Sequence, residues 1–70
     1  MKQIEFSLTE EYIELIRLIK LLRISESGGQ AKQMVENKQV VVNGAIELRK
    51  RAKLRRGEIV VIGDYRIKIQ

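Results

Sequence analysis

The chain has 70 residues, of which 44% are apolar and 33% are charged, and its formal net charge at pH 7 is +5. This size and composition predict one small globular domain over residues 1–70 and argue against a disordered segment. Cysteine and histidine are both absent, which excludes disulfides, the ordinary zinc sites and the most common general base. We therefore expect a non-enzymatic protein without catalytic residues, metal site, cofactor or small-molecule substrate. The lack of cysteine also fits a cytoplasmic location.

The first part of the chain predicts a strand followed by a helix. Apolar and polar residues alternate over residues 3–8, as in a half-buried strand. Thr9 is expected to cap a helix over about residues 10–23, where apolar residues recur at helical spacing. This stretch is too short and too interrupted by charge to span a membrane. No signal peptide is visible before it.

A second helix is predicted over about residues 28–37, because Ser27 and Gln30 have the spacing of a capping box. The pair Gly28-Gly29 forms helix poorly. Such a pair is expected where the backbone comes close to something, either the first helix or a ligand phosphate. The free backbone amides of this turn, with Lys32 alongside, are suited to hold a phosphate. The spacing of a nucleotide-binding P-loop is missing.

The rest of the chain predicts strands. Residues 40–42 and 59–62 are apolar runs, and residues 65–69 alternate strictly. Asn43-Gly44 and Gly63-Asp64 are turn signals. Two helices and a small antiparallel sheet make an α+β domain.

The positive charge is concentrated in residues 49–56, which hold six of the fourteen basic residues and no acid. The remainder of the chain has eight basic and nine acidic residues. Closely spaced cations suit a polyanion, and nucleic acid is the first candidate, because each neutralised phosphate releases counterions. Ala52 and Leu54 are expected to anchor this segment to the core. Glu47 is expected to orient an arginine, Arg49 or Arg51.

The three aromatic residues all fall on apolar faces and are expected in the core; they are Phe6, Tyr12 and Tyr65. Exposed platforms for base stacking are therefore not expected. This favours recognition of a folded RNA through the shape of its backbone.

Four short motifs resemble a known family: SGGQAK at 27–32, VVVNG at 40–44, ELRKRAKL at 47–54 and GE at 57–58. Together they resemble the RNA-binding domain first seen in small-subunit ribosomal protein four, also called the alpha-L RNA-binding motif. The similarity is greatest to small free-standing bacterial members described as ribosome-associated. The resemblance runs from the first helix to the end of the chain. It implies two helices packed on a small, strongly bent antiparallel sheet.

The resemblance implies an RNA surface made by both helices and the loop-strand segment after them. Larger members often carry an arginine after the serine, where this chain has Gly28-Gly29, so contacts of the arginine form do not transfer. The residues expected to bind RNA are Arg23, Ser27, Gly28, Gln30, Lys32, Asn43, Arg49, Lys50, Arg51, Lys53 and Arg55. Arg23, Gln30 and Lys32 are expected to lie beside Asn43 and the basic residues 49–53.

These patterns predict a non-catalytic, monomeric RNA-binding protein of the bacterial cytoplasm. We expect it to dock on structured ribosomal or transfer RNA during ribosome assembly or translation. A second hypothesis is an adaptor whose basic face binds an acidic protein partner within a translation complex. Binding to a membrane surface is disfavoured, because the basic segment lacks an accompanying apolar face.

Overall fold

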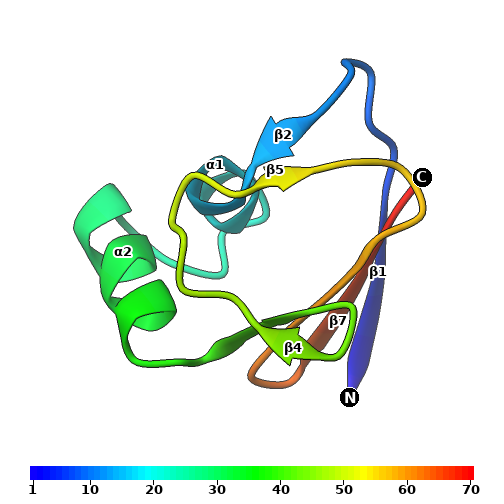
Figure 1. Ribbon diagram of the computed structural model, residues 1–70. Coiled ribbons are helices and arrows are strands. Elements are labelled where there is room, and N and C mark those ends of the chain that lie inside the picture. Colours follow the sequence, from blue (N-terminus) through cyan, green and yellow to red (C-terminus); the bar gives the residue numbers. More distant parts are fainter.

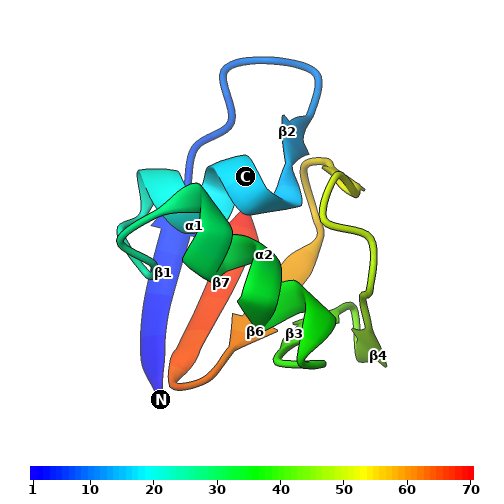
Figure 2. The same ribbon diagram turned by 90° about the vertical axis from the view of Figure 1, so that its left-hand side faces the viewer.

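The computed structural model describes residues 1–70, and its two helices lie together on one side of the main sheet (Figures 1 and 2). The elements in chain order are β1 (Lys2–Phe6), β2 (Ile13–Glu14), α1 (Leu15–Leu21), α2 (Gly28–Glu36), β3 (Val40–Val42), β4 (Ala45–Ile46), β5 (Lys53–Leu54), β6 (Ile59–Ile62) and β7 (Tyr65–Ile69). The expected α+β class, with two helices on a small sheet, is confirmed. Neither helix has the length and apolar composition needed to cross a membrane.

The main sheet has the strand order β1-β7-β6-β3-β4. Four of its strands are antiparallel neighbours, as predicted, and Gly63-Asp64 makes the turn between β6 and β7. The strand β1 lies parallel to β7, with Ile4 opposite Ile67. The sheet is therefore mixed, and the expectation of a wholly antiparallel sheet is wrong for this edge. Alternation shows which residues face the core but not the direction of a strand, and the chain between β1 and β7 is long enough to return either way.

The first helix starts later than predicted. Residues Ile13 and Glu14 form β2, which pairs with β5 as a separate two-stranded sheet (Figure 1). The first helical amides then find partners far along the chain: Leu15 N donates to Ala52 O at 2.9 Å and Ile16 N donates to Lys50 O at 3.1 Å. A distant backbone thus satisfies amides that a side-chain cap would otherwise satisfy. The prediction that Thr9 caps this helix is wrong.

The second helix starts where the capping box predicts. Ser27 Oγ accepts a hydrogen bond from Gln30 N at 3.1 Å. Gln30 Oε1 in turn accepts from Glu26 N at 2.7 Å. These two contacts satisfy amides at the entry to α2 within one local turn. The helix ends at Glu36, one residue before the predicted end.

The core lies between the helices and the sheet and takes apolar side chains from both. Ala52 and Leu54 are 5% and 1% exposed, so their predicted role as anchors of the basic segment is confirmed. Phe6 and Tyr65 pack against the core as expected. Tyr12 does not: its exposed fraction is 36%, and its prediction as a core residue is wrong.

Candidate nucleic-acid interface

The basic segment, residues 49–56, runs across the start of α1 and then alongside β2 (Figure 1). Its two apolar residues, Ala52 and Leu54, point into the core. The intervening cations Arg51, Lys53 and Arg55 are exposed. Exposed cations and buried apolar residues therefore alternate from Arg51 to Arg55, and the positive charge faces outward from a backbone that is fixed by hydrogen bonds and by two buried side chains.

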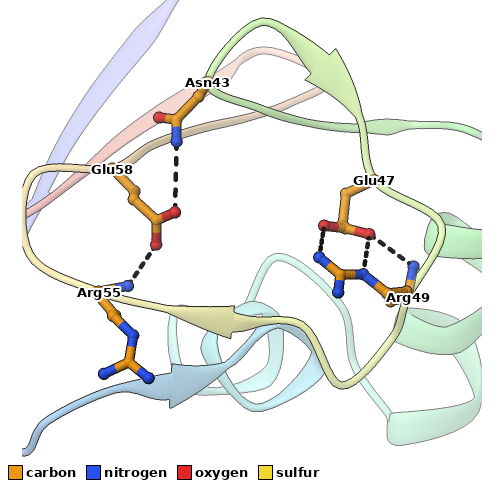
Figure 3. Close-up of polar contacts among 5 residues, drawn as sticks. All are labelled: Asn43, Glu47, Arg49, Arg55 and Glu58. Carbon is orange, nitrogen blue, oxygen red and sulfur yellow. Dashed lines mark hydrogen bonds and ion pairs between the residues drawn. The ribbon is translucent and has the colours of Figure 1, made fainter.

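Glu47 orients the first arginine of the segment, as the sequence predicts (Figure 3). Its carboxylate accepts from Arg49 Nε at 3.1 Å, from Arg49 Nη2 at 3.0 Å and from the Arg49 backbone amide at 3.0 Å. The side-chain hydrogen bond from Arg49 lowers the pKa of Glu47, and the same contact raises the pKa of Arg49. The Glu47 side chain is 16% exposed and that of Arg49 is 79% exposed. The largely buried Glu47 carboxylate thus fixes the orientation of the Arg49 guanidinium, which remains exposed to solvent.

A second carboxylate, Glu58, fixes the other end of the segment (Figure 3). It accepts from the Arg55 backbone amide and, at 3.4 Å, from Asn43 Nδ2. Asn43 Oδ1 accepts from Ile59 N at 2.9 Å. Asn43 has a φ of 51°, which confirms its expected role in the turn after β3. Both polar groups of this side chain therefore have partners within the protein.

Tyr12 lies beside the same segment and is a site residue that the sequence pattern missed. Lys53 Nζ is 4.9 Å and Arg55 Cζ is 5.7 Å from the centroid of its ring. Arg55 Nη1 also contacts Glu11 Oε1 at 3.2 Å. An aromatic ring with two cations within about 6 Å has the geometry of cation–π contacts. Ile13, the next residue, begins an extended segment and points inward, so Tyr12 points outward, and no local sequence pattern signals this.

A second cluster surrounds the start of α2. A Cβ atom placed on Gly28 would lie 3.7 Å from Lys20 Cδ and 3.8 Å from Lys20 Nζ, and no backbone atom outside α2 and the adjoining residue would lie within 4 Å. Lys20 is thus a second residue, after Tyr12, that the sequence pattern missed. Arg23, with a φ of 58°, follows α1 and is exposed. Lys32 contacts Glu36 Oε1 at 4.0 Å on the outer side of α2.

All eleven predicted RNA-binding residues are exposed, and they fall into two clusters. The first holds Asn43 and the basic segment, which the Glu58 contacts join. The second holds Arg23 and the predicted residues of the α2 turn. In Figure 2 the start of α2 lies toward the left and the yellow segment toward the right, with α1 extending between them. No hydrogen bond or ion pair links the two clusters directly.

This arrangement can be compared with known proteins. Residues 6–70 match the family model described as "S4 domain". YbcJ of Escherichia coli (strain K12), named as a candidate RNA-binding protein, is 42% identical over 58 residues, which cover 83% of each chain. YbcJ of Shigella flexneri, named as uncharacterised, matches with the same identity and coverage.

A solved structure supports the same relationship. The solution structure of YbcJ from E. coli, described as revealing an alpha-L motif involved in RNA binding, superposes with a TM-score of 0.73 and is 38% identical. The match covers 99% of this chain and 89% of YbcJ. Because the family model spans nearly the whole sequence and the match to the YbcJ structure covers 99% of it, this chain belongs to the S4 domain family.

Proposed function

We propose that this chain is a non-catalytic RNA-binding protein that docks on structured ribosomal or transfer RNA in the cytoplasm, during ribosome assembly or translation. Membership of the S4 domain family and the description of YbcJ support RNA as the partner. The observation that carries the proposal is the basic segment itself. It holds six cations in eight residues, while the rest of the chain is slightly acidic.

The basic segment supplies most of the attraction. Lys50, Arg51 and Lys53 are exposed and have no ion pair within the protein, so their charges are available to phosphates. Their backbone is already anchored by Ala52 and Leu54. Little conformational freedom of the main chain is therefore lost when RNA binds, and the released counterions favour the complex.

The start of α2 supplies orientation. The amides of Gly28 and Gly29 donate to no protein group, as is usual in the first turn of a helix. No backbone of α1 lies close to Gly28, so packing between the helices does not require glycine there. This favours the other expectation, close approach of a ligand phosphate to these amides, with Lys20 and Lys32 alongside.

Replacing Lys50, Arg51 and Lys53 together with alanine tests the proposal. We expect binding to ribosomal RNA fragments and to transfer RNA to be lost at moderate salt. The slope of log affinity against log salt concentration should become shallower by about 0.7–0.9 for each phosphate contact removed. Circular dichroism should show an intact fold, because the anchors Ala52 and Leu54 are unchanged. Arg49 stays in place, since its removal would leave Glu47 unpaired.

A matched control removes the same charge elsewhere. Lys2, Arg66 and Lys68 lie on β1 and β7, outside the basic segment. Their joint replacement with alanine should weaken binding only slightly and leave the salt slope nearly unchanged. If both triple variants bind RNA as the parent protein does, electrostatic docking through the basic segment is wrong.

A second function has one observation in its favour. Ile46 and Leu48, just before the basic segment, are 55% and 57% exposed. Apolar side chains beside charged ones suit a protein interface, so the same face would serve an adaptor that binds an acidic protein partner. Nuclease treatment separates the two functions. Association with ribosomal particles that survives complete RNA digestion would favour the adaptor, and loss of association would favour RNA.

A further inference from the structure

Tyr12 is the most exposed of the three aromatic residues, and it stands on the loop that enters β2. The next residue, Ile13, is 5% exposed and lies opposite Leu54 in the two-stranded sheet. The backbone on which Tyr12 stands is therefore fixed against β5. This places an accessible aromatic ring directly beside the basic segment.

Two cations of the basic segment surround the ring. Lys53 Nζ lies 4.9 Å from the ring centroid and Arg55 Cζ lies 5.7 Å from it. Lys53 has no ion pair, and Arg55 has one, with the exposed carboxylate of Glu11. Contacts of this kind at exposed sites are weak. A ligand that offers both a flat ring and negative charge can displace them.

We propose that Tyr12 stacks on one unpaired base of the bound RNA, while Lys53 and Arg55 hold the phosphates that flank this base. The inference rests on the proposed RNA-binding function and adds a nucleotide site to it. A polyanion without aromatic groups would contact the two cations but not the tyrosine ring. A nucleotide uses both, because every base has a flat face and an adjoining phosphate. One exposed ring accommodates one base, so the preferred element is a duplex interrupted by a bulge or ending in a loop.

Tyr65 provides an internal comparison. Lys2 Nζ lies 5.7 Å from the centroid of its ring, so this tyrosine also has a cation beside it. Its side chain nevertheless packs against the core, and it lies in β7 on the main sheet, outside the basic segment. Tyr65→Phe should therefore leave RNA binding unchanged and serve as the matched control.

The affinity test uses two RNA probes with the same stem, one closed by an unpaired loop and one a blunt duplex. We expect the parent protein to bind the hairpin more tightly than the duplex. Tyr12→Leu should lower hairpin affinity about tenfold, the loss expected for one stacked base, and leave duplex affinity nearly unchanged. Tyr12→Phe should retain the preference, because phenylalanine keeps the stacking face.

A spectroscopic test measures the fluorescence of Tyr12 without substituting this residue. The chain has two tyrosines and no tryptophan, so Tyr65→Phe leaves Tyr12 as the only fluorescent tyrosine. Stacking on a base should quench this emission strongly when the hairpin binds and weakly when the duplex binds. The reciprocal variant Tyr12→Phe, which reports Tyr65 alone, should show little change with either probe.

The outcomes distinguish failure of the nucleotide site from failure of the proposed RNA-binding function. Absence of binding to both probes by the parent protein would overturn the RNA-binding proposal and the nucleotide site with it. Equal affinity for hairpin and duplex, or a hairpin preference that Tyr12→Leu retains, would overturn the nucleotide site alone. Hairpin binding without quenching of Tyr12 would do the same, even if Tyr12→Leu proves too unstable to assay.

Discussion

Glu47 and Arg49 lie two residues apart, and the Glu47 carboxylate accepts hydrogen bonds from the guanidinium Nε and Nη2 and from the backbone amide of Arg49. Because only one residue separates the partners, the two side chains can meet without contacts from distant parts of the chain. The contact stiffens the entry to the basic segment. It also offsets part of the positive charge of Arg49. The next cations along the segment, Lys50, Arg51 and Lys53, have no ion pair.

This pair makes stability depend on pH in a defined direction. The pKa of Glu47 is lowered in the folded protein from its ordinary value of 4.5. The unfolded chain therefore takes up the proton more readily, and the pair stabilises the fold above about pH 4.5 and loses this contribution as the pH falls through the folded pKa. Glu47→Gln should lower the urea midpoint at pH 7 and have a smaller effect at pH 3.

The matched control for this variant is Glu36→Gln, which removes the same charge from an exposed carboxylate whose partner Lys32 is 4.0 Å away. We expect a smaller change in the urea midpoint for this control at pH 7. An equal effect of Glu47→Gln at both pH values would show that its carboxylate contributes through packing and not through its charge.

The parts of the fold that the sequence predicted correctly depend on contacts between near neighbours. The start of α2 follows from Ser27 and Gln30, three residues apart. The turn at Gly63-Asp64 follows from two residues between alternating strands. The anchors Ala52 and Leu54 stand out because they are the only uncharged residues in the basic segment.

The parts that were missed depend on pairing between distant segments. The pairing of β2 with β5 makes Ile13 and Glu14 extended, although their spacing from later apolar residues is helical. This change of period also turns Tyr12 from the expected core position to the surface. The direction of β1 is set in the same way, by β7 at the far end of the chain. No local pattern encodes these choices.

Asn43 should be required for stability through both its backbone and its side chain. Its φ of 51° disfavours residues other than glycine and asparagine by about 1–2 kcal/mol, and the bond to Ile59 N contributes about 1 kcal/mol. Asn43→Ala should therefore lower the free energy of unfolding by about 2–3 kcal/mol. Asn43→Gly, which keeps the backbone conformation, should lower it by about 1 kcal/mol.

Thermal denaturation measures this difference, since 1 kcal/mol corresponds to a shift of about 4–8 °C in Tm for a domain of this size. Equal Tm values for the two variants would show that the backbone conformation carries no strain. Asn43→Gly also tests the predicted RNA contact of Asn43. With the fold retained, a loss of affinity in this variant would show that the Asn43 side chain contributes to RNA binding, either by direct contact or through its bond to Glu58.

Ser27 connects helix stability to the proposed phosphate site. Ser27→Ala removes the acceptor for Gln30 N and should lower the free energy of unfolding by about 1 kcal/mol. Ser27→Asp keeps an acceptor and places a negative charge at the start of α2, which favours the helix. We expect this variant to be as stable as the parent protein and to bind RNA more weakly, because the aspartate repels a phosphate there.

The pair of variants separates stability from binding in thermal melts and titrations with RNA. If Ser27→Asp binds RNA as tightly as the parent protein, no phosphate lies near this turn. If both variants lose stability equally, the side-chain cap does not support α2.

Gly28→Ala should have opposite effects on stability and on binding. The added Cβ would make only ordinary contacts with Lys20, at 3.7 and 3.8 Å, and Gly28 lies at a helical position. Alanine there should raise the free energy of unfolding by about 0.5–1 kcal/mol, because less backbone entropy is lost on folding. A phosphate held by the amides of this turn would meet the new methyl group, so we expect weaker RNA binding from a more stable protein.

Gln33→Ala is the control for this effect, since it improves helix propensity in the exposed middle of α2 without changing the first turn. It should raise Tm slightly and leave RNA affinity unchanged. Glycine at position 28 would then be retained at a cost in stability, as is expected where a ligand approaches the backbone. A Gly28→Ala protein that is more stable and binds RNA as tightly as its parent would contradict the phosphate site at α2.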